Sequence, residues 1–441
     1  MIQKASHTEE GHGNLLILAL LALIVGAAAG FVGAIFRLTL QQADHLRDAL
    51  IAWAQGEKLA GFLIVVATCA AAALISAWLV RRFSPQASGS GIPYVEAVLN
   101  EEIPQAPLHV IWVKFCGGVL AIGSGLALGR EGPSVQMGAS VAHLVANICR
   151  REWPDCRVLL AAGAGAGLAT AFNAPLAGAI FVLEELVRRF ELHIAVAALG
   201  ASAAAIAVAR MFLGAAPDFH VDALAYSSVE AQPLLFVLGA MAALAAIAYN
   251  RALLKAITAA ERLARLSVEL RAGLIGAAVG TLAWCAPSVV GGGDAITQRS
   301  LIGAETLSVL PLFFLLRFVL GTVSYAAGTP GGLFAPLLAL GAQLGLFFGL
   351  LCRLAFPELD IQPEGFAVVG MAAFFTGVVR APLTGIVLVT EMTASATMLL
   401  PMLVACFPAM LVPTLLRETP IYDSLREHTL QRFPWQKTQI K

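Results

Sequence analysis

The stretches NAPLAGAIFVLEE (residues 173–185) and RAPLTGIVLVTEM (residues 380–392) are two versions of one pattern. Each has a polar residue followed by Ala-Pro-Leu, a glycine three residues after the proline, and an apolar run that ends near a glutamate. They lie 207 residues apart in a chain of 441 residues. We infer that the chain contains an internal duplication, and that this duplication decides its fold.

Further pairs of residues match outside these stretches at nearly the same spacing. The pairs are Gly129, Pro133, Gly138 and Ala139 with Gly332, Pro336, Gly341 and Ala342, and Gly89 and Gly91 with Gly291 and Gly293. Because the order is kept, the two halves are related along most of their length. We predict a first membrane repeat at residues 14–225, a second at residues 226–416, and short cytoplasmic segments at residues 1–13 and 417–441. The repeat alone leaves open whether the halves are parallel or inverted.

The composition indicates a membrane protein. Hydrophobic residues make up 59% of the chain and charged residues 13%, against about 25% charged residues in a soluble domain. This excludes a soluble enzyme, a disordered chain and a single-span anchor, and long apolar runs exclude an outer-membrane barrel. The expected fold is an all-α, polytopic integral membrane protein with broken and re-entrant helices. The net charge is zero, so no nucleic-acid partner is expected.

The distribution of Lys and Arg predicts the orientation in the membrane. The arginine pairs at 81–82 and 188–189, and the basic residues between 251 and 271, should face the cytoplasm. The linker at 216–233 has no Lys or Arg and should lie outside. Both termini are then expected in the cytoplasm.

Three Gly/Pro-limited breaks each open an apolar run. Backbone N–H groups at a helix start are unpaired and carry partial positive charge, so several starts meeting inside the membrane would hold an anion without a full positive charge. The alternative is that the breaks only let helices pack closely. The motifs are GSGIP (Gly89, Ser90, Gly91, Ile92, Pro93), GREGP (Gly129, Arg130, Glu131, Gly132, Pro133) and GLFAP (Gly332, Leu333, Phe334, Ala335, Pro336).

Glu131 is a carboxylate inside one of these breaks, and its counterpart in the second half is Phe334. A carboxylate within the membrane is costly and marks a functional site by default. We expect Glu131 to compete, as a tethered anion, for the site of a free anion, and to leave that site when protonated. The alternative is a salt bridge to Arg130.

Two adjacent acids close the first of the duplicated stretches. Glu184 matches Glu391, whereas Glu185 falls on Met392. The symmetric acid is expected to be structural in both halves, and the unmatched Glu185 to be functional. The alternative for Glu185 is a solvated carboxylate beside Arg188 and Arg189.

Two hydroxyls are further candidates. Ser90 lies between two glycines, where its hydroxyl can donate one hydrogen bond to an anion; the alternative is a helix N-cap. Tyr422 follows the last apolar run, and the alternative there is a tyrosine of the interfacial belt. Glu96 and Lys114 are most simply interfacial or paired.

The sequence lacks the common motifs of metalloproteases, serine hydrolases and P-loop nucleotide-binding proteins. There is no HExxH, GxSxG or GxxxxGK[ST], and none of the seven cysteines forms a CxxC pair. We expect no enzymatic activity, no metal and no organic cofactor. Any driving force must then come from ion gradients.

The motifs and their order resemble the CLC family of chloride channels and transporters. GSGIP, GREGP followed by SVQMG, GGLFAP followed by LLALG, and a late Pro-Ile-Tyr carry the resemblance, which runs over nearly the whole chain and is closest to the bacterial proton-coupled branch. It implies two inverted halves and a homodimer with one anion pathway per subunit in a bacterial inner membrane. It also implies H+/Cl− exchange, with chloride and protons as the only substrates; the alternative is a passive chloride channel gated by voltage or pH.

The resemblance also implies roles for single residues. Ser90 and Tyr422 would give hydroxyls to the central chloride, and Leu333 and Phe334 their amides. Glu131 would be the external gate. Glu185 would be the internal proton acceptor, and an acid there resembles the exchangers rather than the channels. Serine at position 90 is similar to chloride-preferring members, while Tyr94 departs from close bacterial relatives, which carry an acid there.

Overall fold

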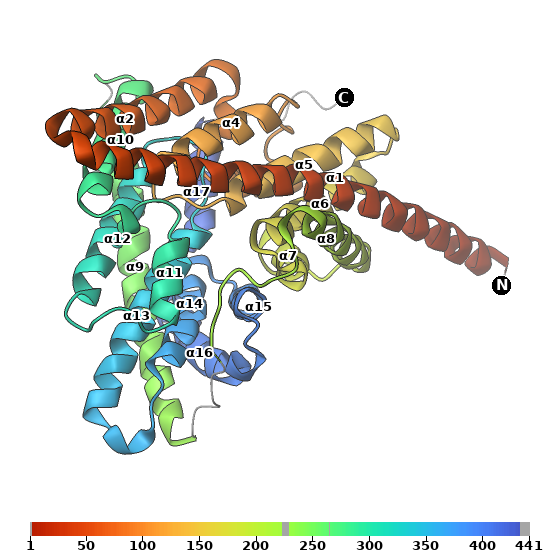
Figure 1. Ribbon diagram of the computed structural model, residues 1–441. Helices are drawn as coiled ribbons and strands as arrows, with labels where there is room; N and C mark the ends of the chain where they lie inside the picture. The colour runs from red at the N-terminus through yellow and green to blue at the C-terminus, as the bar shows by residue number, and fades with distance from the viewer. Residues whose placement is uncertain (1, 223–228, 264, 433–441) are drawn as a thin grey trace.

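The computed structural model describes residues 2–222, 229–263 and 265–432, and almost all of them lie in helices or the short turns between helices (Figure 1). The first half consists of α1 (Ile2–Ala54), α2 (Lys58–Phe83), α3 (Ile92–Leu99), α4 (Val110–Gly123), α5 (Glu131–Ile148), α6 (Trp153–Phe172), α7 (Pro175–Phe181) and α8 (Leu192–Leu213). The second half consists of α9 (Gln232–Arg262), α10 (Val268–Cys285), α11 (Asp294–Leu301), α12 (Leu310–Tyr325), α13 (Phe334–Ala355), α14 (Pro363–Val379), α15 (Pro382–Thr393), α16 (Leu399–Leu415) and α17 (Ile421–Arg432). The all-α expectation is confirmed.

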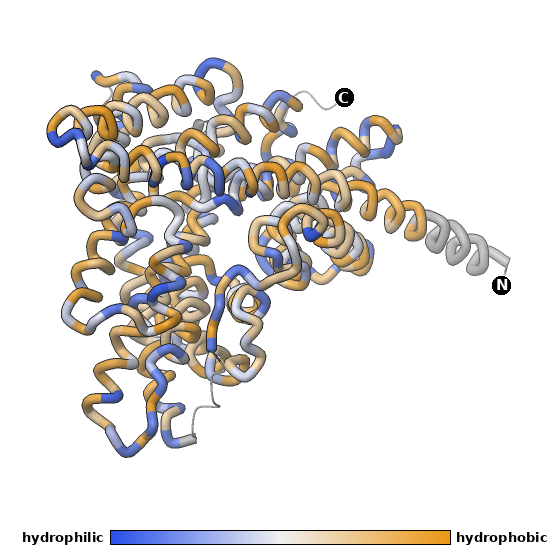
Figure 2. The backbone as a smooth tube through the Cα atoms, viewed as in Figure 1, coloured by the Kyte–Doolittle hydropathy of each residue, from blue (hydrophilic) through white to orange (hydrophobic). Residues whose placement is uncertain are grey.

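Many of these helices have the length and the apolar composition of membrane-spanning segments. Seven helical stretches of the described residues are long and apolar enough to cross a membrane, and four shorter apolar helices accompany them. Hydrophobic residues cover the helices, and hydrophilic residues gather mainly near their ends (Figure 2). Outward-facing side chains such as Leu46, Leu274 and Leu315 are more than half exposed, which suits a hydrocarbon solvent and not water. The protein is therefore a polytopic membrane protein.

The duplicated stretches form the same broken helix in both halves. Asn173 ends α6 with φ 50°, and α7 begins at Pro175; Arg380 ends α14 with φ 72°, and α15 begins at Pro382. A proline fits the first helical position because its missing N–H has no intrahelical partner there. The sequence breaks at these positions are confirmed.

The long helices before these breaks cross their neighbours at matching glycines. A Cβ atom on Gly138 of α5 would lie 2.2 Å from the carbonyl oxygen of Gly163 on α6. A Cβ atom on Gly341 of α13 would lie 2.4 Å from the carbonyl oxygen of Gly370 on α14. Both helix pairs therefore need glycine to let their backbones approach this closely.

Glu184 and Glu391 join the two halves to each other. The Glu184 carboxylate accepts hydrogen bonds from the N–H groups of Leu383 and Thr384 at the start of α15, at 3.0 and 2.6 Å. The Glu391 carboxylate accepts from the N–H groups of Leu176 and Ala177 at the start of α7, at 3.1 and 2.8 Å. Each half thus caps a helix of the other half, and the symmetric acid has the structural place that its symmetry predicted.

Three of the predicted segment boundaries can be compared with the residues that the structure describes. The boundary between 225 and 226 lies outside the described residues. Helix α1 begins at Ile2, so the backbone of the proposed N-terminal segment continues directly into the first long helix. The proposed C-terminal tail begins with α17, which packs against α3 of the first half, and its residues 433–441 lie outside the described residues.

Candidate functional site

The predicted breaks of the two halves meet and hydrogen-bond to each other. Gly129 and Gly332 exchange two backbone hydrogen bonds, with N···O distances of 2.8 and 2.7 Å. These are equivalent residues of the repeat, and the two segments run antiparallel at this point, which is consistent with a two-fold relation between the halves. Gly89 accepts a hydrogen bond from the N–H of Gly331 at 3.1 Å. The starts of α3, α5 and α13 are thereby brought together from distant parts of the chain.

The Glu131 carboxylate occupies the point where these segments meet. Its Oε1 atom accepts a hydrogen bond of 2.6 Å from the N–H of Phe334 at the start of α13, and the side chain is fully buried. It lies against two glycines, because a Cβ atom on Gly129 or Gly332 would stand 2.0 Å from a carboxylate oxygen. A tethered anion therefore sits on helix-start amides, in a space that only glycine leaves open.

Arg130 is directed elsewhere, so its predicted alternative pairing with Glu131 is wrong. Its guanidinium donates to Asp218 at 2.9 Å, to Asp294 at 3.0 Å, and to the carbonyl oxygen of Ala171 at 2.7 Å. Asp218 also pairs with Arg37 of α1 at 2.5 Å. Arg130 is thus fixed by acids from the linker and from the second half, while Glu131 has no ion-pair partner within the described residues.

Ser90 and Tyr422 bring two buried hydroxyls to the same region. Within the part of the chain that the structure describes, neither hydroxyl has a hydrogen-bond partner, and both are buried. Gly91 occupies the N-cap position of α3 with φ 87°, and no side chain caps that helix, so the N-cap alternative for Ser90 is wrong. Complete burial also excludes an interfacial-belt role for Tyr422. Buried hydroxyls normally find a partner, which fits two donors aimed at a small anion.

Aromatic rings from both halves form the wall beside these groups. The Phe334 ring lies 5.9 Å from the Tyr422 ring and 4.6 Å from the Phe375 ring, measured between centroids. Phe172 and Phe181 of the first half pack against it at 6.3 and 5.7 Å. Leu333, the N-cap residue of α13, is also fully buried. The amide end of α13 is therefore shielded from water by apolar rings.

Two buried cations hold the segments that precede α3 and α11. The ammonium group of Lys114 donates to the carbonyl oxygens of Ala87 and Gly89 at 3.0 and 2.7 Å. Arg317 donates to the carbonyl oxygens of Val289, Gly291 and Gly292 at 3.0, 2.7 and 2.9 Å. The interfacial alternative for Lys114 is therefore wrong. Lys114 and Arg317 are equivalent at the shift of 203 residues that relates GREGP to GLFAP. This matched pair of basic residues is a sequence signal from which the two loop contacts could have been predicted.

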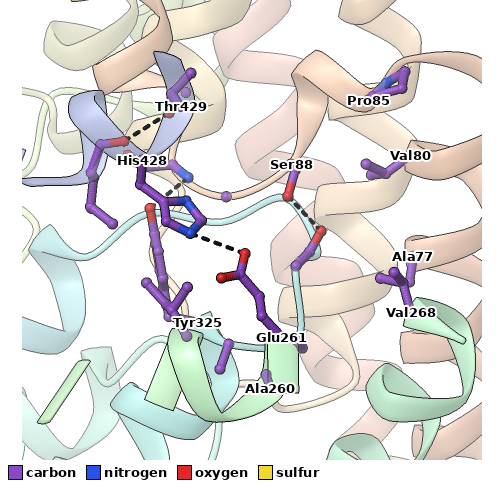
Figure 3. A pocket seen from close by; sticks show the side chains of 18 of the residues that line it. Ala77, Val80, Pro85, Ser88, Ala260, Glu261, Val268, Tyr325, His428 and Thr429 are labelled. Carbon is purple, nitrogen blue, oxygen red and sulfur yellow. Dashed lines mark hydrogen bonds and ion pairs between the residues drawn. The ribbon is translucent and has the colours of Figure 1, made fainter. Parts of the chain in front are cut away.

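A cavity of about 350 Å³ leads to the GSGIP segment (Figure 3). Gly89, Ser90 and Gly91 line it together with Tyr94, whose hydroxyl donates to the carbonyl oxygen of Pro104 at 2.9 Å. In Figure 3 the His428 ring of α17 points at the Glu261 carboxylate of α9, with 3.0 Å between the facing atoms. Arg81 and Arg271, for which the sequence predicts a cytoplasmic position, also line the cavity. The cavity thus ends at the segment that carries Ser90.

Glu185 lies in a π-helical turn, η3 (Val182–Leu186), that continues α7. Its side chain is only 3% exposed, so the solvated alternative is wrong, although its carboxylate does lie 3.2 Å from the Arg188 guanidinium. Glu96 of α3 is 1% exposed and pairs with Arg426 at 3.0 Å, as the paired alternative for Glu96 predicted. Single-turn π-bulges occur frequently at functional sites. A second buried acid thus lies apart from the amide-bound one.

Fold and site together define a class of protein. Two repeats of broken membrane helices place amide groups, hydroxyls and one buried carboxylate at a shared centre, which is the construction of an ion-transport protein. The sequence profile described as voltage gated chloride channel matches residues 72–414. The chain therefore belongs to this family, the CLC family, and the resemblance inferred from the motifs is confirmed.

Individual relatives match nearly the whole chain. The H(+)/Cl(-) exchange transporter ClcA of Vibrio parahaemolyticus is 39% identical over 420 residues, covering 93% of this chain and 90% of the relative. The protein of the same description from Klebsiella pneumoniae is 36% identical over 424 residues, covering 95% and 90%. The X-ray structure of a slow cyanobacterial Cl−/H+ antiporter has a TM-score of 0.90 and 31% identity, and the match covers 94% of this chain and 98% of that chain.

Proposed function

We propose that the protein is a secondary antiporter that exchanges chloride for protons across the membrane. The observation that carries this proposal is the Glu131 carboxylate, which is hydrogen-bonded to the Phe334 amide at 2.6 Å between two glycines. A site that binds its own tethered anion will also bind a free one, and the two occupants exclude each other. Relatives that are described as H(+)/Cl(-) exchange transporters support the same conclusion.

The competition links the two ions. A proton on Glu131 removes the charge that holds the side chain against the Phe334 amide, so the carboxyl group leaves and chloride takes its place. Chloride would then be held by the amides of Leu333 and Phe334 and by the hydroxyls of Ser90 and Tyr422, which lack other partners in the described structure. Helix-start amides and hydroxyls bind an anion without a full positive charge, so the ion can also leave.

Glu185 serves as the internal proton acceptor in this proposal. It is buried and lies outside the group of residues that would hold chloride, so the proton and the anion take separate routes on the cytoplasmic side. The acid at this position favours an exchanger over a passive channel of the same fold. No enzymatic step and no cofactor is needed, because the two gradients supply the energy.

The assembly and placement belong to the same proposal. The protein would be a homodimer with one ion pathway per subunit, in the inner membrane of a bacterium, with both termini in the cytoplasm. The dimer would bury apolar faces of α7, α8, α15 and α16, which carry exposed large side chains. These include Leu176, Leu199, Leu383 and Phe407, whose exposures are 54, 50, 56 and 61%.

Flux into liposomes tests the proposal directly. The purified protein is reconstituted, a chloride gradient is imposed, and the external proton concentration is followed at zero initial pH difference. An exchanger moves protons uphill, and a protonophore abolishes that movement. Chloride flux without proton movement would show a passive channel, and movement of neither ion would remove both readings.

A further inference from the structure

Three carboxylates meet at one arginine on the cytoplasmic side of the site. The Arg188 guanidinium nitrogen Nη2 lies 2.7 Å from Asp423, 3.2 Å from Glu185 and 3.6 Å from Glu96, measured to the nearest carboxylate oxygen. The three acids come from α17, from η3 and from α3. Arg188 is thus the group through which the buried proton acceptor touches two other parts of the fold.

The backbone is shaped to direct Arg188 back over Glu185. The chain leaves the π-helical turn η3, and Arg188 has φ 54°, a left-handed conformation that a residue with a side chain adopts at a cost. This turn lets the Arg188 Nε atom donate to the carbonyl oxygen of Glu185 at 3.2 Å while Nη2 reaches its carboxylate. The Arg188 guanidinium therefore donates to both the main-chain carbonyl and the carboxylate of Glu185.

The other charged groups in the cluster divide the contacts unequally. Glu96 already has Arg426 of α17 at 3.0 Å, and Arg426 also approaches Glu102 at 3.8 Å. Asp423 has a single ion-pair partner among the described residues, which is Arg188. The Arg188 guanidinium is therefore shared chiefly between Glu185 and Asp423.

Asp423 directly follows Tyr422 in the first turn of α17. The Tyr422 hydroxyl lies at the proposed chloride site, and its ring packs on Phe334. A change in the ion pair between Arg188 and Asp423 therefore acts on the helical turn that also carries Tyr422. This covalent connection joins the arginine cluster to the anion site without any further side chain.

We propose that Arg188 is a positioning residue that links proton loading of Glu185 to α17 and so to Tyr422. While Glu185 is charged, the guanidinium is divided between Glu185 and Asp423. When Glu185 takes up a proton, the pull toward it weakens and Arg188 pairs with Asp423 alone, which holds the first turn of α17 more firmly. The inference rests on the proposed exchange function and adds a contact between its two ion routes.

Two substitutions test this link because they have opposite expected signs. Asp423→Asn removes the competing carboxylate, so Arg188 pairs mainly with Glu185. The pKa of Glu185 should then fall, and Glu185 should stay charged at lower pH. The pH profile of proton transport should move down by about one unit, the size expected for one nearby charge. Arg188→Gln removes the cation from Glu185, and the profile should move up. Chloride-driven proton transport in liposomes is measured from pH 4 to pH 8 for each variant.

Three controls separate this role from simple damage. Glu427→Gln changes an exposed acid on the same helix and should leave the profile unchanged. Asp423→Glu keeps the charge and should restore most of the unmodified profile. In a Glu185→Gln background, Asp423→Asn should have no further effect on chloride flux if it acts through Glu185.

The outcomes distinguish this inference from the proposed function. Proton transport with the same pH profile in Asp423→Asn and in the unmodified protein overturns the link alone. Equal losses of chloride flux with and without Glu185 would show that Asp423 only supports Tyr422, which overturns it too. An unmodified protein that carries no protons would overturn both the link and the exchange function.

Discussion

The two halves agree at some matched positions and differ at others, and the difference separates scaffold from function. Glu184 and Glu391 are the same residue, and each caps a helix of the opposite half. Lys114 and Arg317 are both cations, and each holds the carbonyl groups of a loop. These symmetric positions make bonds that keep the broken helices in place.

The positions that would handle ions are asymmetric. The position equivalent to Glu131 in the second repeat holds Phe334. In the same way, Glu185 is equivalent to Met392, and Ser90 to Gly292. Phe334 contributes an amide and a ring where Glu131 contributes a carboxylate, so in the proposed mechanism one half would bind chloride and the other half would compete with it. A duplication thus supplies a symmetric frame, and transport requires that the symmetry be broken at the centre.

The largest effect is expected at the most asymmetric position. Glu131→Gln cannot carry a proton or act as a competing anion, so chloride-driven proton transport should be lost completely while chloride flux persists. Both fluxes are measured in the same liposomes. The exposed acid Glu358 provides a matched control, because Glu358→Gln should leave both fluxes unchanged. Proton movement that survives in Glu131→Gln would remove the gate assignment.

The neighbouring acids at 184 and 185 sharpen the comparison, since only one of them has a counterpart. Glu185→Gln should stop proton transport but leave Glu131 free to gate, so chloride flux should still respond to external pH. Glu184→Gln should retain proton coupling. If Glu184→Gln uncouples the protein and Glu185→Gln does not, the two roles have been assigned in the wrong order.

The symmetric caps should respond alike. Glu184→Gln and Glu391→Gln each replace a carboxylate that accepts two backbone hydrogen bonds, and each should destabilise the protein by about 1–3 kcal/mol. The thermal unfolding midpoints of both variants in detergent are compared with that of the unmodified protein. A large loss in one variant and none in the other would contradict the reciprocal role.

The smallest effect is expected for a single hydroxyl. Ser90→Pro removes one donor to the anion, worth about 0.5–1.5 kcal/mol, and chloride should lose more than nitrate because nitrate depends less on one directed donor. Proline also removes the N–H of residue 90, which donates to the Tyr325 hydroxyl at 3.3 Å, so some loss for both anions is expected. An unchanged chloride-to-nitrate flux ratio would mean that Ser90 does not contact the permeating ion.

Much of this architecture could be predicted because it depends on local sequence patterns. Glycine and proline mark the breaks at Asn173 and Arg380, and sliding one half along the other finds the pair Glu184 and Glu391. The family resemblance points to Ser90, Glu131 and Tyr422, and the structure brings the motifs that carry them together.

The remaining contacts could not be read from the sequence because they join unrelated segments. Asp218 of the linker meets Arg130 over 88 residues, and Asp423 meets Arg188 across the two halves. Tyr325 matches Ile122 in the repeat, so no symmetry marks it, yet its hydroxyl accepts from the Ser90 amide. The fold brings Asp218 to Arg130 through the linker after α8, Tyr325 to Ser90 through the end of α12, and Asp423 to Arg188 through α17.

The reciprocal caps also constrain how the protein is made. The N–H groups at the start of α7 wait for a carboxylate that is synthesised 214 residues later. Until the second repeat has been synthesised, these amides of the first repeat lack the carboxylate that accepts from them in the folded protein. Helix α7 gains these caps only after the second repeat has been made, and α15 in turn depends on Glu184 of the first repeat, so each half completes the hydrogen bonding of the other.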